Sequence, residues 1–265
     1  MSTRPAHTDL PYSHAGDEDQ ARLEALSEAL DPITISVLEA LPDTGDAACL
    51  ELGAGNGTIA RWMADHLPSA QVTATELDLR HLEAEGRKNL DFVRHDVTQD
   101  QFPEVAFGLI HARWLLHHLP VRERVLPEIT KWLAPGGHLV LEEPALFPLQ
   151  AAQDEPYRRV SLGALTVLAQ RVGTDCGTPS LNLARKLAEL GLSDVTMRVT
   201  CPTVAVNTPA GRFWRLTLQH LADDIAQLPD IHRDDVTTVI HRLSQPGFLE
   251  LGMATITVTG TKPRT

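Results

Sequence analysis

The chain has 265 residues, of which 43% are hydrophobic, so it is long enough to bury a large core in one domain carrying a modest cap. Its 35 acidic residues against 23 Lys and Arg give a formal net charge of -12, and no cationic stripe could track a phosphate backbone, which excludes nucleic acid as an expected partner. Three scattered cysteines, with no signal-peptide core and no run of roughly 20 apolar residues, exclude a disulfide scaffold and a membrane partner, so we expect a cytoplasmic protein.

The first residues of the chain show no periodic spacing of apolar side chains, and a pattern typical of a helix follows them. Leu23, Leu26 and Leu30 recur at helical spacing behind an acidic first turn, which favours a helix N-terminus. We expect this helix to end near Pro32 and a second, short helix to run to about Leu41.

The middle of the chain alternates short apolar runs with helical segments. The pattern predicts strands at about 47–52, 71–76, 91–95, 106–111 and 137–142, with helices near 57–66, 79–89 and 121–133. Such alternation is typical of a parallel sheet covered by helices on both faces.

Beyond Pro144 the alternation stops. We expect helices at about 150–172, 180–190, 209–226 and 232–243, and strands at 195–206 and 252–260, the last with Thr and Val in period 2. The predicted organisation is an N-terminal helical lid over residues 1–45, followed by one domain over 46–265. Cap helices are inserted into that domain at about 145–190 and 207–245.

A glycine-rich turn follows the first predicted strand, in the stretch ELGAGNG. Gly53, Gly55 and Gly57 let the backbone approach a ligand closely. The dinucleotide-binding fingerprint G-x-G-x-x-G/A requires Gly or Ala at its last position, and this chain has Thr58 there. Glu76 ends the next strand 23 residues after Gly53, close to the offset at which a carboxylate accepts hydrogen bonds from a ribose. The pattern indicates an adenosine ligand; the alternative is that Glu76 is an ordinary strand-end charge.

Four stretches in order resemble the motifs of the class I S-adenosylmethionine-dependent methyltransferases. They are ELGAGNG, VTATELD, FVRHDV and FGLIHARWLLHHLPVRERVLPEITKWLAPGGHLVLEEP, which together cover about residues 47–144. The resemblance implies a doubly wound, Rossmann-like α/β sheet of seven strands, the last antiparallel, with an α-helical cap. It also implies S-adenosyl-L-methionine as the methyl donor and S-adenosyl-L-homocysteine as the product.

The resemblance also implies which residues bind the donor. Glu51, Gly53, Gly55 and Asn56 would form the loop under its methionine part, Glu76 would bind the ribose, Leu77 would pack on the adenine, Asp96 and Val97 would flank the adenine amino edge, and Arg113 would lie beside the donor. In bacterial small-molecule methyltransferases of similar layout, an N-terminal segment closes over the donor. Tyr12 and Arg22 are placed to reach the donor carboxylate in that way, unless they are a solvated arm and a surface cation.

Methyl transfer from a sulfonium is an in-line displacement, for which alignment and water exclusion supply at best about 7–11 kcal/mol. A base is needed only for some acceptors. His117 and His118 follow the fourth strand and Glu143 ends the fifth, at the sheet edge where open α/β folds bind ligands, so we consider all three as catalytic candidates. Because neighbouring strand residues point to opposite faces, Glu142 and Glu143 do not both face the pocket. The alternative is that these side chains pack in or anchor the loop.

A metal site is not predicted. His111, His117 and His118 have no carboxylate or cysteine at a spacing that completes a ligand set. The amphipathic segments after residue 155 carry Tyr157, Phe213, Trp214 and His220, which either pack in the cap or line an apolar acceptor pocket.

We therefore expect a methyltransferase acting on a small aromatic or heteroaromatic acceptor, plausibly a secondary metabolite. N- or C-methylation is favoured over O-methylation because the sequence shows no metal site for a catechol-type hydroxyl. An NAD(P)-dependent reductase remains an alternative, although no third fingerprint glycine and no Tyr-x-x-x-Lys constellation is visible. A non-catalytic protein that binds S-adenosylmethionine is another alternative, and the sequence is compatible with a monomer or a homodimer.

Overall fold

A seven-stranded sheet forms the centre of the computed structural model, which describes residues 17–43, 45–80 and 82–264. The strand order is β3-β2-β1-β4-β5-β9-β6. The strands are β1 (Cys49–Leu52), β2 (Val72–Glu76), β3 (Leu90–Arg94), β4 (Phe107–Arg113), β5 (Leu133–Ala145), β6 (Ser193–Thr200) and β9 (Ala254–Thr261). β1 to β5 pair in parallel, whereas β9 is antiparallel to both β5 and β6. The predicted fold class is confirmed, including the antiparallel last strand.

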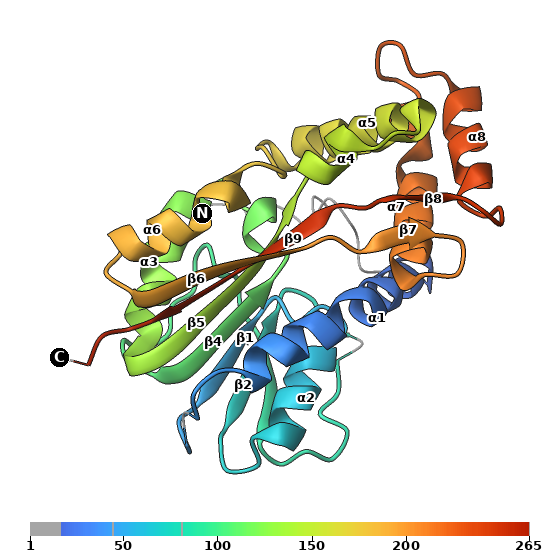
Figure 1. Ribbon diagram of the computed structural model, residues 1–265. Coiled ribbons are helices and arrows are strands. Elements are labelled where there is room, and N and C mark those ends of the chain that lie inside the picture. The colour runs from blue at the N-terminus through green and yellow to red at the C-terminus, as the bar shows by residue number, and fades with distance from the viewer. Residues whose placement is uncertain (1–16, 44, 81, 265) are drawn as a thin grey trace, which may run out of the picture.

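Helices cover both faces of this sheet (Figure 1). α1 (Asp17–Glu39) and α2 (Thr58–His66) pack on one face through the cluster that contains Val37, Met63 and Val72. α3 (Arg122–Trp132) and α6 (Leu183–Glu189) pack on the other. No helix in the described part of the chain is long and apolar enough to cross a bilayer.

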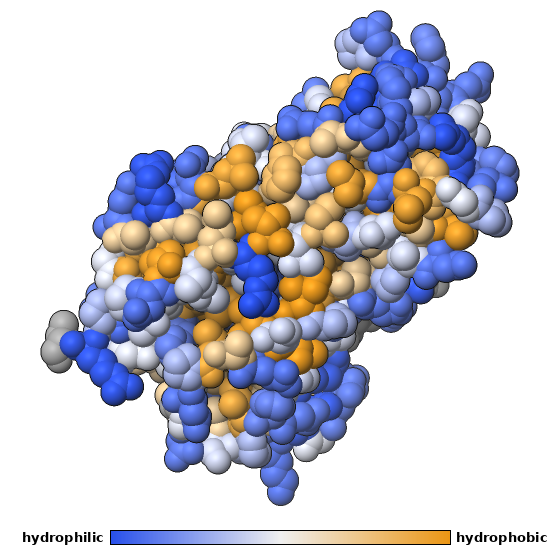
Figure 2. Space-filling model, viewed as in Figure 1, coloured by the Kyte–Doolittle hydropathy of each residue, from blue (hydrophilic) through white to orange (hydrophobic). Residues whose placement is uncertain are grey.

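A cap with its own apolar core stands over the carboxyl ends of the parallel strands (Figure 1). It is built from α4 (Phe147–Ala151), α5 (Glu155–Val172), α7 (Pro209–Ile225), α8 (Arg233–Arg242) and the two-stranded sheet of β7 (Thr203–Ala205) and β8 (Leu249–Leu251). Ala25 of α1 belongs to the cap core, so α1 connects the cap to the sheet. In Figure 2 the outer surface of the cap around α8 is hydrophilic, while apolar residues gather along β6 and β9, where Met197 and Val199 are exposed.

The N-terminal helix is longer than predicted. α1 is one helix with Pro32 in its interior, so the predicted break at Pro32 is wrong. An interior proline costs about 3 kcal/mol or more. Burial of Leu30, Val37 and Leu38 on either side of it, together with polar contacts of Asp31 to the sheet, offsets that cost.

The helix predicted over 79–89 is also wrong, because the described residues of that range form turns and irregular backbone. The carboxylate of Asp78 accepts the Arg80 backbone N–H at 3.1 Å, which favours a turn. Glu85 and Gly86 have φ values of 51° and 81°, in the left-handed region that a helix does not use.

The remaining differences concern element bounds. The strand predicted at 195–206 is divided into β6 and β7 at Pro202, which cannot donate to a ladder. The helix predicted at 180–190 begins as the 3-10 turn η2 (Pro179–Asn182) before α6. β5 is longer than predicted, and its pairing with β4 is irregular between Leu133 and His138, where Gly136 and Gly137 lie.

Candidate active site

A cavity of about 210 Å³ lies between the carboxyl ends of the parallel strands, α1 and the cap. It brings together most of the residues singled out from the sequence: Arg22, Glu51, Gly53, Gly55, Asn56, Glu76, Leu77, Arg113, His117 and His118. A larger cavity of about 720 Å³ lies beside the start of β5, α1's end and Arg264, and none of the predicted residues lines it. We therefore place the candidate site in the smaller cavity.

The glycine loop turns the chain from β1 into α2 under this cavity. Gly53, Gly55 and Gly57 have φ values of 69°, 58° and 77°, which other residues adopt only with strain. A Cβ on Gly55 would meet no atom within 4 Å, so the space above it is open to a ligand. The Gly55 backbone N–H donates to Glu76 Oε2 at 3.0 Å, and the Leu77 N–H donates to the other oxygen at 2.8 Å. Glu76, at the end of β2, therefore holds the glycine loop in place through its hydrogen bond with the Gly55 N–H.

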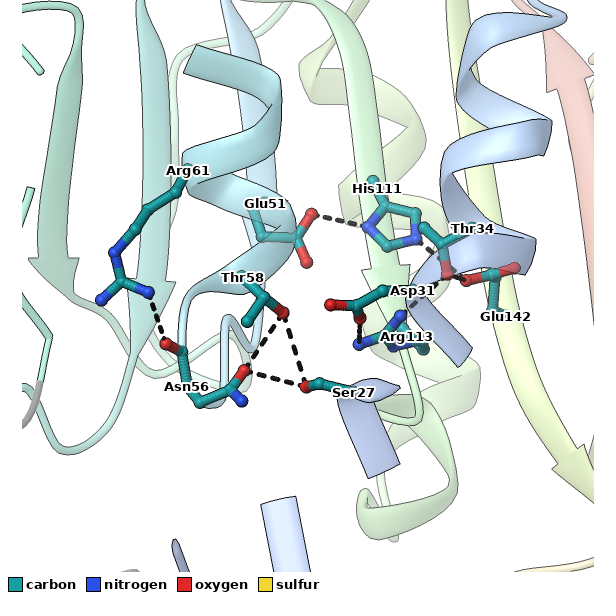
Figure 3. A network of polar contacts seen from close by, with 10 residues as sticks. All are labelled: Ser27, Asp31, Thr34, Glu51, Asn56, Thr58, Arg61, His111, Arg113 and Glu142. Carbon is teal, nitrogen blue, oxygen red and sulfur yellow. Dashed lines mark hydrogen bonds and ion pairs between the residues drawn. The ribbon is translucent and has the colours of Figure 1, made fainter. Parts of the chain in front are cut away.

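Asn56 joins the same loop to α1 (Figure 3). Its side-chain oxygen accepts hydrogen bonds from the Ser27 hydroxyl at 3.0 Å and the Thr58 hydroxyl at 3.2 Å. Ser27 was not predicted, because a serine on a helix of unknown register carries no distinguishing signal. Nearby, Arg22 is 5% exposed and forms an ion pair with Asp19 at 2.7 Å.

Two residues predicted to flank the ligand do not line the cavity. The Asp96 carboxylate accepts hydrogen bonds from the Thr98 hydroxyl at 2.7 Å and the Thr98 N–H at 3.0 Å, so it closes its own turn. Val97 is buried in the core cluster under α3. Tyr12 lies outside the described residues.

A buried polar network runs beneath the cavity from β1 to α1 (Figure 3). His111 is completely buried, with Nδ1 2.6 Å from Glu51 Oε2 and Nε2 3.3 Å from Glu142 Oε2. Thr34 donates to the same Glu142 oxygen and accepts from Arg113 at 2.9 Å. Arg113 also binds Asp31 at 2.7 Å. The sequence analysis considered His111 only as a metal ligand, whereas its neighbours here are carboxylates.

The network favours a charged His111. Burial alone lowers the pKa of His111, but the carboxylates of Glu51 and Glu142 outweigh burial and raise it to about 9. In turn, the hydrogen bond from His111 keeps the pKa of Glu142 below its ordinary value, although burial acts in the opposite direction. The most consistent state is an imidazolium held between two carboxylates.

This pKa predicts a dependence of stability on pH. Because the folded state keeps the His111 proton more tightly than the unfolded state does, its contribution is complete below about pH 6.5. That contribution is lost as the pH rises through about 9. We expect the free energy of unfolding to fall over this range by at most about 1.4 kcal/mol per pH unit from this group. Urea unfolding at a series of pH values measures it, and His111→Gln should flatten the curve; an unchanged slope would contradict the assignment.

Glu143 points to the opposite side of β5 and anchors the segment after β4. Its carboxylate accepts the backbone N–H groups of Leu115, Leu116 and His117 at 3.1, 2.7 and 2.9 Å. His117 Nδ1 lies 3.2 Å from the same carboxylate. These contacts hold the short 3-10 helix η1 (Leu116–His118) against the end of β5. Glu143 is 3% exposed and does not line the candidate-site cavity of about 210 Å³.

Burial shifts the pKa values of both Glu143 and His117. It raises the pKa of Glu143 to about 7, against the effect of the three N–H donors. It also lowers the pKa of His117 to about 3, with the nearby Arg122 acting in the same direction. A histidine of this kind stays neutral at physiological pH and is a weak base.

Aromatic side chains form the cap side of the cavity. Trp114, Phe213 and Trp214 line it, with the Trp114 and Phe213 rings edge to face at 5.7 Å. Phe213 and Trp214 are on the wall as proposed from the sequence, whereas Tyr157 and His220 are not. The Tyr157 side chain is fully buried in the cap and its hydroxyl donates to the Leu251 carbonyl, and His220 is exposed on α7. Trp114 was missed, although its place directly after β4 was a signal.

The chain is similar in sequence to known methyltransferases. Residues 50–141 match the family model described as a methyltransferase domain. The chain is 36% identical over 98 residues to methyltransferase str3 of Strobilurus tenacellus, which covers 36% of this chain and 34% of that protein. It is 29% identical over 164 residues to 27-O-demethylrifamycin SV methyltransferase of Amycolatopsis mediterranei, covering 58% of this chain and 59% of that protein. The chain thus spans about a third to three fifths of the length of these curated relatives.

A solved structure shows the same fold over nearly the whole chain. Phosphoethanolamine N-methyltransferase 2 of Haemonchus contortus, in complex with S-adenosyl-L-methionine, superposes with a TM-score of 0.60 at 14% identity. The superposition covers 96% of this chain and 59% of that chain. The cap as well as the sheet therefore lies within the shared architecture.

Proposed function

We propose that this chain, a member of the class I S-adenosylmethionine-dependent methyltransferase family, transfers a methyl group from S-adenosyl-L-methionine to a small organic acceptor. One observation carries the proposal. The glycine loop, with the Gly55 N–H on the Glu76 carboxylate, opens into a cavity whose opposite wall is the aromatic surface of the cap. A polar, acidic donor side and an apolar acceptor side thus meet at one point.

The residues fit the donor in chemical kind. Glu76, at the end of β2, supplies carboxylate oxygens suited to ribose hydroxyls, and Leu77 supplies an apolar surface for the adenine. Glu51 presents a buried negative charge suited to the ammonium of the methionine part. Arg22, on α1, provides the cation suited to the donor carboxylate. When bound, the sulfonium supplies the electrophilic methyl group, and these residues bind and orient it.

For the acceptor we propose a flat aromatic or heteroaromatic molecule, methylated at nitrogen or carbon in preference to oxygen. Trp114, Phe213 and Trp214 offer aromatic faces and edges against which such a ring packs. His117 has a depressed pKa and is bonded to Glu143, so it is a poor base for removing a phenol proton. A neutral amine needs no base before transfer, because it can lose its proton afterwards.

The test begins with calorimetric titration of the full chain with S-adenosyl-L-methionine, S-adenosyl-L-homocysteine and NADPH. The protein is then incubated with labelled donor and a panel of indoles, amines and phenols, and products are identified by mass spectrometry. We expect donor binding and a labelled small product. NADPH binding in place of the donor would support a reductase, and donor binding without any product across the panel and a cell extract would support a non-catalytic binder. Methylation of phenols alone would overturn the preference for nitrogen or carbon.

A matched pair of glycine substitutions tests the loop. Gly55→Ala and Gly45→Ala each place a Cβ at nearly the same φ, 58° and 61°, with no atom within 4 Å. Both should therefore destabilise the fold by about 1 kcal/mol through backbone strain alone. Only Gly55→Ala places its methyl group in the donor space, so we expect at least a tenfold loss of affinity for S-adenosyl-L-homocysteine by calorimetry. Equal affinity in the two variants would exclude a close approach of the donor to Gly55.

A further inference from the structure

His111 touches Glu51 but does not line the cavity, so any effect it has on a ligand passes through Glu51. Glu51 does line the cavity, although its side chain is only 4% exposed. Glu51 and His111 are direct partners in the β1–β4 register, and Glu142 is the partner of Arg113 in the β4–β5 register. All four side chains therefore lie on the face of the sheet that α1 covers.

The histidine ring is held from both sides. Its two nitrogens contact carboxylates on different strands, so the ring cannot rotate without losing both contacts. Glu142 is itself fixed by the hydroxyls of Thr34 on α1 and of Thr257 on β9, the latter at 2.9 Å. The orientation of the Glu51 carboxylate is thus set by a chain of contacts that begins on α1.

The charges of the network suit a cationic ligand group. Three carboxylates, those of Asp31, Glu51 and Glu142, face two cations when His111 is protonated. One negative charge is left over, and Glu51 is the member that borders the cavity together with Arg113. A buried surplus of this sign favours an ammonium or sulfonium partner.

We infer that His111 is a positioning residue for the methyl donor: it fixes the Glu51 carboxylate toward the cationic end of the donor, and α1 holds it in place through Thr34 and Glu142. This role rests on the proposed function. It assigns to the β4 histidine and to the middle of α1 a part in donor binding without contact to the donor.

Two amide variants, each of which keeps one of the two histidine contacts, separate positioning from simple structural support. In His111→Asn the amide nitrogen takes the place of Nδ1 and keeps the bond to Glu51, whereas in His111→Gln it takes the place of Nε2 and keeps the bond to Glu142. Both remove the same charge from the same buried position. We expect His111→Gln to bind S-adenosyl-L-homocysteine at least tenfold more weakly than His111→Asn, at similar melting temperatures. Equal dissociation constants, or weaker binding by the asparagine variant, would overturn the inference.

A milder pair keeps the test decisive if the histidine variants do not fold. Thr34→Val removes the hydroxyl between Glu142 and Arg113, and Thr130→Val removes the hydroxyl of another buried threonine, on α3, which donates to the Pro127 carbonyl at 2.7 Å. Only Thr34→Val should weaken donor binding, by about threefold to tenfold, and equal affinities would contradict the inference. Absence of donor binding by the unmodified protein would instead refute the proposed function itself.

Discussion

Replacement of Glu51 by glutamine is expected to weaken binding of S-adenosyl-L-methionine by roughly 30-fold or more, which corresponds to about 2 kcal/mol or more. Glutamine keeps the size of the side chain and an oxygen that accepts from His111 Nδ1, so the contact across β1 and β4 survives. What is lost is a buried negative charge at the cavity wall, where the low dielectric makes it most effective.

The control for this variant is Asp65→Asn. This substitution also removes one negative charge, but Asp65 lies near the end of α2 and forms an exposed ion pair with Arg87. Calorimetry should show donor affinity within twofold of the unmodified protein for Asp65→Asn, because exposed pairs contribute little and are screened by salt. If Glu51→Gln binds the donor as tightly as this control does, Glu51 does not interact with the donor cation.

The fold was predictable because its determinants are local. β1 and β4 are short, mostly apolar and almost fully buried runs, and the helices α2 and α3 follow from apolar periodicity. The failures arise where tertiary contacts override local signals. Pro32 remains inside α1 because Asp31 and Thr34, on either side of it, bind side chains of the sheet. Residues 79–89 have a helical composition, but within them Glu85 and Gly86 adopt left-handed backbone angles.

The candidate site was predictable only as far as its motifs reach. The glycine loop and Glu76 have fixed spacing, so their convergence follows once β1 and β2 are neighbours. The link between His111 and its two carboxylates depends on the register of three strands, which sequence separation does not specify. The contribution of α1 is even less predictable from the sequence, because Thr34 and Glu142 are 108 residues apart in the chain.

Glu142 and Glu143 are neighbours near the end of β5, so their side chains point to opposite faces of the sheet and have different partners. Glu142 points to the face covered by α1 and contacts His111, whereas Glu143 points to the other face and binds the backbone after β4. The sequence analysis left two roles open for Glu143, a catalytic group near the acceptor or an anchor for the loop. Its geometry supports a structural role, and a variant can distinguish the two.

Glu143→Ala is expected to lower the free energy of unfolding by about 3 kcal/mol or more. The substitution leaves the buried N–H groups of Leu115, Leu116 and His117 without their acceptor, and each such group costs about 1–3 kcal/mol. Urea unfolding followed by circular dichroism measures the loss. Because η1 carries His117 and His118 on the cavity wall, turnover should fall together with stability.

Glu250→Ala is the matched control, since the Glu250 carboxylate also accepts three backbone N–H groups, those of Gln153, Asp154 and Leu251, but is partly exposed in the cap. Water can replace that acceptor, so its loss should cost less than about 1 kcal/mol. A catalytic base would give a different pattern. Glu143→Ala would then leave stability and donor affinity unchanged while turnover fell and the pH–rate profile lost its limb near pH 7, where the pKa of this carboxyl lies. If the variant is stable and binds the donor but its pH–rate profile lacks that limb, Glu143 is a catalytic group. Only a group that exchanges a proton with the acceptor changes the pH–rate profile without changing the stability of the fold.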